Sequence, residues 1–211
     1  MTKGLLITFE GIDGCGKSLM QKMTNIMLTD RGYATLMTRE PGGSDLGQRF
    51  RKMLLDSKYG SVDPNTETLL FMADRSRHVN DVIAPALAEG KIVLCDRYID
   101  STIAYQGGGR GLAIDRLNAL NDFAINGVYP DMTFFLDISV EQAERRLRGE
   151  KDRMEQENGD FFRKVAAAYS GLADACPQRI RRINASLDID GVFLQIKTLV
   201  DQLLQDRGLA R

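Results

Sequence analysis

Residues 5–18 read Leu-Leu-Ile-Thr-Phe-Glu-Gly-Ile-Asp-Gly-Cys-Gly-Lys-Ser, and this stretch decides the fold. The apolar run over residues 5–9 predicts a strand that is buried on both faces. Residues 11–18 then match the pattern GxxxxGK[ST]. Its glycines let the backbone curl so that N–H groups point at phosphate oxygens, and a following helix adds the positive end of its dipole. The stretch therefore predicts a strand, a phosphate-binding loop (P-loop) and a helix, in that order.

Two side chains of this loop have the chemistry of an ATP site. In such loops the lysine, here Lys17, reaches the β- and γ-phosphates, and the hydroxyl of the next residue, Ser18, is a ligand of Mg²⁺. A second apolar run, residues 91–95, ends directly before Asp96. An aspartate at the end of a strand can hold the metal or its waters, so Ser18 and Asp96 are the expected metal site. The residues expected to contact ATP are Gly11, Ile12, Asp13, Gly14, Cys15, Gly16, Lys17 and Ser18.

Apolar runs and helical periods alternate along the rest of the chain. Further strands are expected at residues 34–38, 133–136 and 182–185, about five in all. The alternation predicts an α/β fold, in which a P-loop-type parallel sheet is flanked by helices and binds ligands beyond the carboxyl ends of its strands. The helical spacing groups the following apolar residues on shared faces: Leu19, Met23, Ile26 and Met27; Leu69, Met72, Val79, Val82, Ile83 and Leu87; Leu117, Leu120 and Ala124; Val192, Ile196, Val200 and Leu204.

Length and composition fit one globular domain, 1–211. The formal net charge of -1 disfavours a nucleic-acid-binding protein. Cys15, Cys95 and Cys176 form no CxxC pair, which favours a reducing compartment. The N-terminal apolar stretch is too short for a signal peptide, and no apolar run reaches the roughly 18 residues that span a bilayer. We therefore expect a cytoplasmic protein with neither a nucleic-acid nor a membrane partner.

Four further segments give the chain a resemblance to a known family. They are residues 38–43 (Thr-Arg-Glu-Pro-Gly-Gly), 71–75 (Phe-Met-Ala-Asp-Arg), 96–98 (Asp-Arg-Tyr) and 104–108 (Ala-Tyr-Gln-Gly-Gly). In order and spacing they resemble those of bacterial thymidylate kinase, from residue 4 to about residue 186. The resemblance implies a nucleoside monophosphate kinase that uses ATP and Mg²⁺ to convert dTMP to dTDP, on the route to dTTP. It also implies a homodimer formed through helices beside the sheet.

The resemblance assigns roles to individual residues. Arg97 would lie where donor and acceptor phosphates meet, and a guanidinium there can offset their repulsion. Phe71 resembles the residue that stacks on thymine, and Arg75 the donor to a thymine carbonyl. Tyr105 resembles the ring that crowds the 2′ position of the sugar, and residues 40–41 a turn with a cis peptide. The residues expected to contact dTMP are Asp13, Arg39, Glu40, Pro41, Arg51, Phe71, Arg75, Arg97, Thr102, Tyr105 and Gln106.

The segment 141–160 is dense in charge, and by composition it reads equally well as a solvated helix face. Members of the family place a catalytic arginine either in the P-loop or in a lid. Residues 12–15 here contain no arginine, so the resemblance implies a lid over residues 141–158 that closes over ATP. Arg153 is the first choice for its catalytic arginine, followed by Arg148, with Arg146 also in range.

Other classes of protein also contain a P-loop. The chain lacks the NKxD pattern by which GTPases read guanine, and its DxxG pattern at 188–191 falls at a predicted helix start. A P-loop kinase with a different acceptor would prefer a substrate other than dTMP. A non-catalytic nucleotide sensor would bind ATP without turnover, which the many arginines disfavour.

Overall fold

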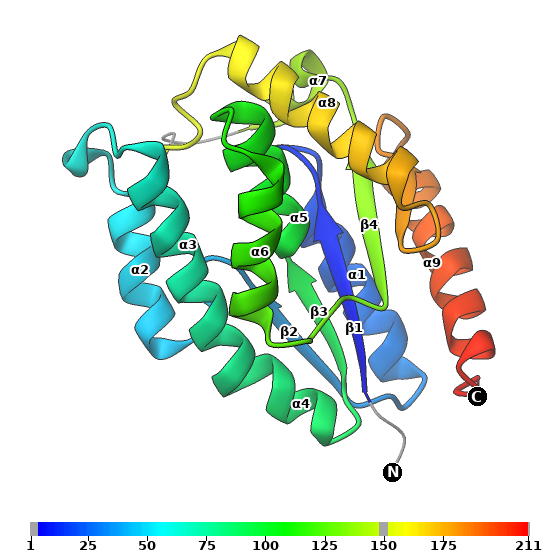
Figure 1. Cartoon of the computed structure of the whole chain (residues 1–211). Helices are drawn as coiled ribbons and strands as arrows, with labels where there is room; N and C mark the ends of the chain where they lie inside the picture. The colour runs from blue at the N-terminus through cyan, green and yellow to red at the C-terminus, as the bar shows by residue number, and fades with distance from the viewer. Residues whose placement is uncertain (1–3, 148–151, 211) are drawn as a thin grey trace.

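The computed structural model describes residues 4–147 and 152–210, and a five-stranded sheet forms its centre (Figure 1). Every strand pair is parallel, and the strand order is β2-β3-β1-β4-β5. The predicted α/β class and the number of strands are confirmed, and each observed strand lies within two residues of its predicted bounds. The strands are β1 (Leu5–Glu10), β2 (Thr35–Arg39), β3 (Ile92–Asp96), β4 (Met132–Asp137) and β5 (Ile180–Asn184).

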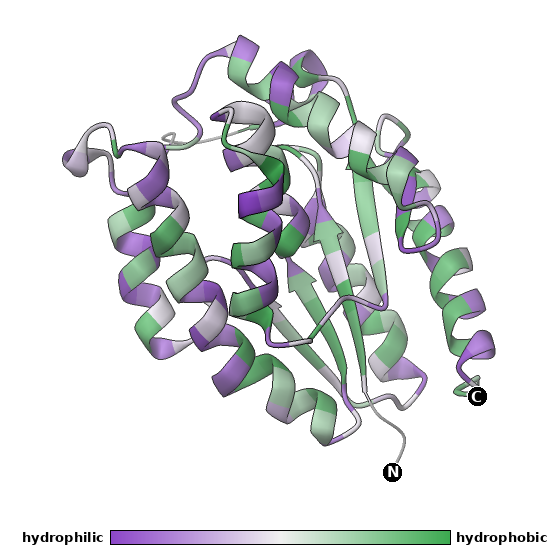
Figure 2. Ribbon diagram, in the orientation of Figure 1, coloured by the Kyte–Doolittle hydropathy of each residue, from purple (hydrophilic) through white to green (hydrophobic). Residues whose placement is uncertain are grey.

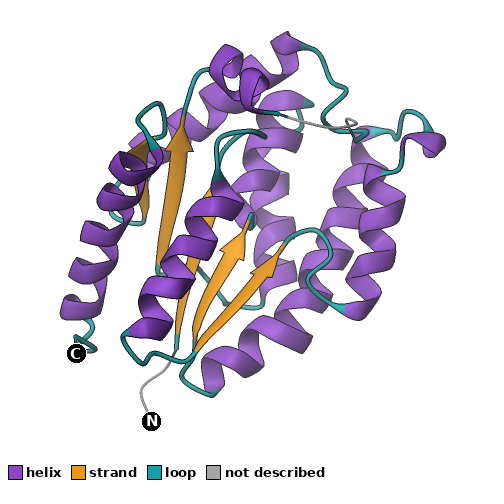
Figure 3. Ribbon diagram, turned by 180° about the vertical axis from the view of Figure 1, so that it is seen from behind, coloured by secondary structure: helices purple, strands orange, loops and turns teal. Residues whose placement is uncertain are grey.

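Helices cover both faces of this sheet. Figure 3 shows α1 crossing one face with α9 beside it, whereas α3, α5 and α6 lie on the face that Figure 1 presents. The helices are α1 (Lys17–Asp30), α2 (Asp45–Leu55), η1 (Ser57–Tyr59), α3 (Pro64–His78), η2 (Val79–Ile83), α4 (Ala84–Ala88), α5 (Ile99–Thr102), η3 (Ile103–Gly109), α6 (Ile114–Ile125), α7 (Val140–Arg146), α8 (Gly159–Ala175) and α9 (Ile189–Asp206). Among the described residues no helix is long and apolar enough to cross a membrane.

The strands are apolar without alternation because both faces of the sheet are covered. Leu5, Ile7 and Phe9 join one buried cluster, and Leu6 between them joins a second cluster under α4 and η2. Figure 2 shows the strands green along most of their length, with hydrophilic positions on the outer sides of the helices. At roughly 25 cal/mol per Å² of buried apolar surface, these two clusters are the main stabilising contribution to the fold.

The predicted apolar face of α1 is only partly correct, since Met23 and Met27 are half-buried and pack against the core. Leu19 and Ile26 are 42% and 57% exposed, and the buried side carries Met20, Gln21 and Thr24 instead. Gln21 can be buried because its amide donates to the carbonyl oxygens of Thr38 and Leu94 at 2.7 Å each, which joins α1 to the sheet edge. Hydropathy alone assigns such a residue to solvent, so the apolar pattern did not find the fully buried side of the helix.

Three other predicted helix faces agree with the structure to different degrees. Val192, Ile196, Val200 and Leu204 of α9 are all buried, as expected. In the segment from α3 to α4, Met72, Val79, Ile83 and Leu87 are buried, whereas Leu69 is 58% exposed. In α6, Leu117 and Ala124 are buried and Leu120 is half-buried. The sequence also did not indicate that η2 and η3 are π-helical, a conformation frequent at functional sites.

Candidate active site

The carboxyl ends of the strands open into a cavity of about 1290 Å³. The P-loop follows β1, Arg39 ends β2 and Asp96 ends β3, so three neighbouring strands bring their terminal residues to one place. Arg146 of α7 and residues 187–190, which lead into α9, complete the walls. The P-loop, Arg39 and Asp96 thus lie at the carboxyl ends of the strands, where the sequence predicts ligand binding.

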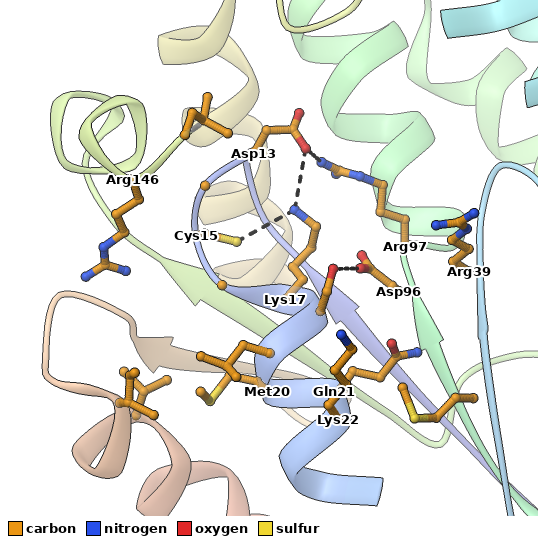
Figure 4. A pocket seen from close by; sticks show the side chains of 18 of the residues that line it. Asp13, Cys15, Lys17, Met20, Gln21, Lys22, Arg39, Asp96, Arg97 and Arg146 are labelled. Atoms are coloured by element: carbon orange, nitrogen blue, oxygen red, sulfur yellow. Dashed lines mark hydrogen bonds and ion pairs between the residues drawn. The ribbon is translucent and has the colours of Figure 1, made fainter. Parts of the chain in front are cut away.

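The P-loop wraps around the side chain of Lys17 (Figure 4). Lys17 is 7% exposed, and its Nζ donates to the carbonyl oxygens of Gly11 and Ile12 at 3.0 Å each. Gly14 has a φ of 83°, and a Cβ there would lie 2.3 Å from the carbonyl oxygen of Ala143. Only glycine fits this turn, which therefore curls closely enough for its N–H groups to converge on one point.

The hydroxyl of Ser18 and the carboxylate of Asp96 meet at the mouth of the loop. Ser18 Oγ donates to Asp96 Oδ2 at 2.6 Å, although the two residues belong to α1 and β3. Both groups offer hard oxygen ligands, which suit Mg²⁺. In the described chain no cluster of three or more His, Cys, Asp or Glu side chains forms a metal cage. The donor set fits a metal that is held mainly by its nucleotide.

Arg97 and Asp13 form an ion pair between β3 and the P-loop. Arg97 Nη2 lies 2.5 Å from Asp13 Oδ1, and Nη1 donates to the carbonyl oxygen of Gly11 at 3.0 Å. The hydroxyl of Tyr105 donates to Asp13 Oδ2 at 3.0 Å, with the Arg97 guanidinium 4.9 Å from the ring centre. Burial opposes ionisation of Asp13, but Arg97 and Lys17 outweigh it and lower the pKa of Asp13 to about 2. Arg97 has a left-handed φ of 69°, which turns its side chain back over the loop.

A second cavity of about 150 Å³ adjoins the first, between α3, η3 and the P-loop. Arg75 of α3 is 2% exposed at its wall, with Nε 2.7 Å from Glu40 Oε2. Its Nη1 donates to Thr102 Oγ1 at 2.6 Å and to Asn121 Oδ1 at 2.5 Å, and its Nη2 donates to the carbonyl oxygen of Tyr98 at 2.9 Å. These bonds use four of the five N–H groups and fix the guanidinium plane. Other residues expected at the acceptor that line this cavity are Phe71, Thr102, Tyr105 and Gln106.

The turn after β2 lies between the two cavities. The peptide bond between Glu40 and Pro41 is cis, as the resemblance implied. Arg51 of α2 lines both cavities and donates from Nη1 to the carbonyl oxygen of Pro41 at 2.9 Å. Burial and the nearby charge of Arg39 lower the pKa of Arg51. The neighbouring guanidinium groups of Arg39 and Arg51 therefore form a site that favours an anion.

The arginines of the predicted lid lie at different places. Arg146 lines the larger cavity on the opposite side of the P-loop from Arg97 and Arg39 (Figure 4). Arg153 does not line it: its Nε donates to the carbonyl oxygen of Leu54 at 2.6 Å, and its Nη2 lies 2.8 Å from Glu67 Oε2. The expected approach of Arg153 to the phosphates is therefore not what the structure shows, because a buried carboxylate holds its guanidinium elsewhere. Arg148 lies outside the described residues.

With the two cavities described, the sequence and fold can be compared with those of known proteins. A family model described as thymidylate kinase matches residues 9–196. The chain belongs to the thymidylate kinase family. It is 41% identical over 201 residues to the thymidylate kinase of Clostridium novyi. The matched region covers 93% of this chain and 98% of that one. The chain is 46% identical over 201 residues to the thymidylate kinase of Nostoc punctiforme, covering 93% and 95%.

A solved structure leads to the same family. The fold is similar to that of the thymidylate kinase from Ehrlichia chaffeensis, with a TM-score of 0.79, 34% sequence identity, and 94% of this chain and 98% of that one covered. The predicted resemblance to thymidylate kinase is thereby confirmed. As a thymidylate kinase, the chain is an ATP-dependent kinase of dTMP.

Several residues in and beside the two cavities were not predicted from the sequence. Residues 187–190 line the larger cavity beside α1, and their sequence indicates a helix start but no ligand contact. Glu10 directly precedes the P-loop and accepts hydrogen bonds from the hydroxyls of Ser101 and Tyr169 at 2.6 and 2.8 Å. On α3, Glu67 lies four residues before Phe71 and eight before Arg75, so it shares their helix face. This spacing could have indicated that Glu67 lies beside the site.

Proposed function

We propose that this enzyme transfers the γ-phosphoryl group of ATP to dTMP where the two cavities join, with ATP in the larger one and dTMP in the smaller. The observation that carries this arrangement is the shared wall. Asp13, Arg51 and Arg97 line both cavities, so both phosphates would face the same guanidinium groups. Phosphoryl transfer needs positioning and charge neutralisation more than covalent chemistry, and paired arginines supply both.

In this arrangement the P-loop N–H groups and Lys17 hold the phosphates of ATP. Lys17 must first leave the carbonyl oxygens of Gly11 and Ile12, and the incoming phosphates replace those acceptors. Arg97 then exchanges part of its pairing with Asp13 for the phosphate of dTMP. Arg39 and Arg51 hold the same phosphate, and Arg146, Arg148 or both supply lid charge to the migrating group.

Ser18 and Asp96 would hold Mg²⁺ with the nucleotide. When bound, Mg²⁺ would neutralise the negative charge that develops on the phosphate oxygens of the nucleotide. Their 2.6 Å hydrogen bond keeps the two oxygen ligands together before the nucleotide arrives. Asp13 would contact the sugar hydroxyl of dTMP or a water of the metal.

The smaller cavity suits a pyrimidine better than a purine. Phe71 offers a ring for stacking, and the fixed guanidinium of Arg75 offers an N–H to a base carbonyl. The hydroxyl of Tyr105 is held on Asp13, so its ring cannot withdraw from the sugar. A ring fixed beside the 2′ position favours deoxyribose over ribose.

A coupled ADP-release assay over a panel of nucleoside monophosphates tests the proposal. We expect dTMP to give the highest kcat/KM, and Arg97→Ala to lower kcat by at least about a hundredfold. Arg116→Ala on α6 is the control for loss of a positive charge outside both cavities. If another nucleotide is preferred, the acceptor pocket is misassigned; if ATP binds without turnover, the protein is a sensor.

We further propose that the enzyme is one domain with a lid over residues 141–158, and that it forms a homodimer. The apolar side chains of Leu69 on α3 and Phe123 on α6 are 58% and 85% exposed, on helices that pack together beside the sheet. A second copy would cover them. Light scattering after gel filtration should give twice the chain mass, and Phe123→Glu should reduce it to one. The cytoplasmic location expected from the cysteines stays a prediction.

A further inference from the structure

Glu67 is a buried carboxylate at the edge of the smaller cavity. It has no exposed surface and lies on the same face of α3 as Phe71 and Arg75, one and two helical turns earlier. Its two oxygens are paired with side chains from two separate parts of the chain. Gln106 and Arg110 come from η3 and the residue after it, and Arg153 comes from the lid segment. Glu67 thus joins α3, η3 and the lid segment at one point.

Two guanidinium groups keep this carboxylate charged. Arg110 donates from Nε to Glu67 Oε1 at 3.2 Å and from Nη2 to Oε2 at 3.1 Å, and Arg153 Nη2 lies 2.8 Å from Oε2. Burial alone would raise the pKa of Glu67, but hydrogen bonds from Arg110 and Gln106 lower it below its ordinary value. Glu157 pairs with the remaining arm of Arg110 at 2.5 Å, so two acids balance two arginines.

The charged carboxylate fixes the orientation of a neighbouring amide. Gln106 Nε2 donates to Glu67 Oε1 at 3.0 Å, and Gln106 is 2% exposed on the cavity wall. An ionised carboxylate can only accept hydrogen bonds, so the amide nitrogen must face Glu67. The carbonyl oxygen of Gln106 is then directed away from Glu67, and a flipped amide would place two acceptors against each other.

The orientation of the Gln106 amide determines which pyrimidine edge the cavity wall can bind. Thymine presents a carbonyl oxygen beside an N3–H donor, whereas cytosine presents an amino group beside a bare N3 acceptor. A wall with the Arg75 donor and the Gln106 carbonyl acceptor matches thymine at both positions and opposes cytosine at both. A polar mismatch of this kind costs far more than a missing methyl group.

The same carboxylate also holds a second wall of the cavity. Arg153 donates from its backbone N–H to the carbonyl oxygen of Leu55 at 3.0 Å, while its guanidinium pairs with Glu67. Its sequence neighbours Asp152, Met154 and Glu155 line the cavity. Anchoring Arg153 therefore fixes the position of these three neighbours.

We propose that Glu67 is a positioning residue for base selection, which orients the amide of Gln106 as an acceptor and anchors the lid segment through Arg153. The inference rests on the proposed function, because it takes the smaller cavity as the dTMP site. Glu67 itself does not touch the substrate. Its removal should change the choice between pyrimidines and leave the ATP site unchanged.

Glu67→Gln tests the orientation of Gln106, because an amide at position 67 can accept or donate and so lets Gln106 flip. We expect kcat/KM for dTMP to fall by at least about tenfold, and the ratio of kcat/KM for dTMP over dCMP to narrow by a similar factor. The KM for ATP should stay within about twofold. Arg153→Gln tests the anchoring of the lid segment, and it should raise the KM for dTMP while the ratio over dCMP is kept.

Glu89→Gln is the control for the loss of an acid, since Glu89 pairs with Lys91 and lines neither cavity, and all parameters should stay near wild type. If Glu67→Gln does not fold, Glu67→Asp keeps the charge between the arginines, withdraws it from Gln106 by one methylene and should narrow the ratio in the same direction. An unchanged ratio in a folded Glu67 variant would overturn the inference while the proposed function stands. A wild-type enzyme that prefers dCMP would overturn both.

Discussion

The hydroxyl of Ser18 donates a hydrogen bond to the carboxylate of Asp96 across 2.6 Å, and so joins the P-loop to the end of β3. Ser18→Ala and Asp96→Asn should each raise the Mg²⁺ concentration that gives half-maximal activity, by about tenfold or more. Because the two groups act on one ion, the double variant should lose less than the product of the single losses. Mg²⁺ titrations at saturating ATP measure this. Ser57→Ala in η1 is the control, and strictly multiplicative losses would argue against a shared metal.

Lys17→Ala should abolish turnover, by at least about a hundredfold in kcat, and leave the fold intact. Lys17 supplies the point charge for the phosphates, and its two carbonyl partners in the P-loop can be solvated by water in the variant. ADP release and thermal melting should be measured on the same preparation. Lys197→Ala, which removes a surface ion pair in α9, is the charge control. A folded variant with near-normal kcat would contradict the P-loop assignment.

The lid arginines should separate by kinetic effect. Arg146→Ala or Arg148→Ala should lower kcat more than it raises the KM for dTMP, as expected of a contact made mainly in the transition state. Arg153→Ala should instead act mainly on the KM for dTMP, because its guanidinium is paired with Glu67. Steady-state kinetics of the three variants decide this. If Arg146→Ala and Arg148→Ala both keep kcat within about twofold, below roughly 0.5 kcal/mol, these two arginines belong only to a solvated face.

The acceptor order should be dTMP, then dUMP, with dCMP and purine nucleotides close to background. The missing methyl of dUMP costs about 1–3 kcal/mol in an apolar pocket, so dUMP should be a poorer substrate and not an inert one. Arg75 would face the amino group of cytosine with a donor, which leaves both donors unpaired. Arg75→Ala should lose activity on dTMP and narrow its advantage over dCMP. Competition assays with mixed substrates check the order, and a preference for AMP or GMP would refute the base pocket.

Asp74 should make stability fall as pH rises through the acidic range. Its carboxylate is 1% exposed near Glu40, Arg75 and His78, and within the described residues Oδ2 has no hydrogen-bond partner. Burial, with the charge of Glu40, raises the pKa of Asp74 from 3.8 to about 7. Between these values the folded state binds more protons than the unfolded state, so the free energy of unfolding decreases with rising pH, by at most about 1.4 kcal/mol per pH unit.

Asp74→Asn should remove this contribution while it keeps an acceptor for the N–H of Gly42. Denaturant unfolding between pH 4 and 7 is the measurement. The difference in unfolding free energy between variant and wild type should shift in favour of the variant as pH rises. A difference independent of pH would mean that Asp74 is ionised throughout this range.

The sequence by itself determined the order of elements, the parallel sheet and the place of the phosphate site. These follow from local chemistry: residues 5–18 need no distant partner to specify a buried strand, a glycine loop and a helix start. Arg39 and Arg97 follow predicted strands directly, which places them at one sheet edge because parallel strands share their carboxyl ends.

Only the tertiary structure decided which buried groups pair with one another. Gln21 of α1 is buried because a carbonyl oxygen of β2 and one of β3 accept hydrogen bonds from its amide. Arg153 pairs with Glu67 because the charge of a buried carboxylate must be neutralised. Hydropathy and spacing along one chain describe a residue's own preference for water, whereas these placements depend on partners up to 86 residues away (153 − 67). Local sequence patterns therefore could not show which side of α1 is buried, or that Arg146 lines the larger cavity while Arg153 pairs with Glu67.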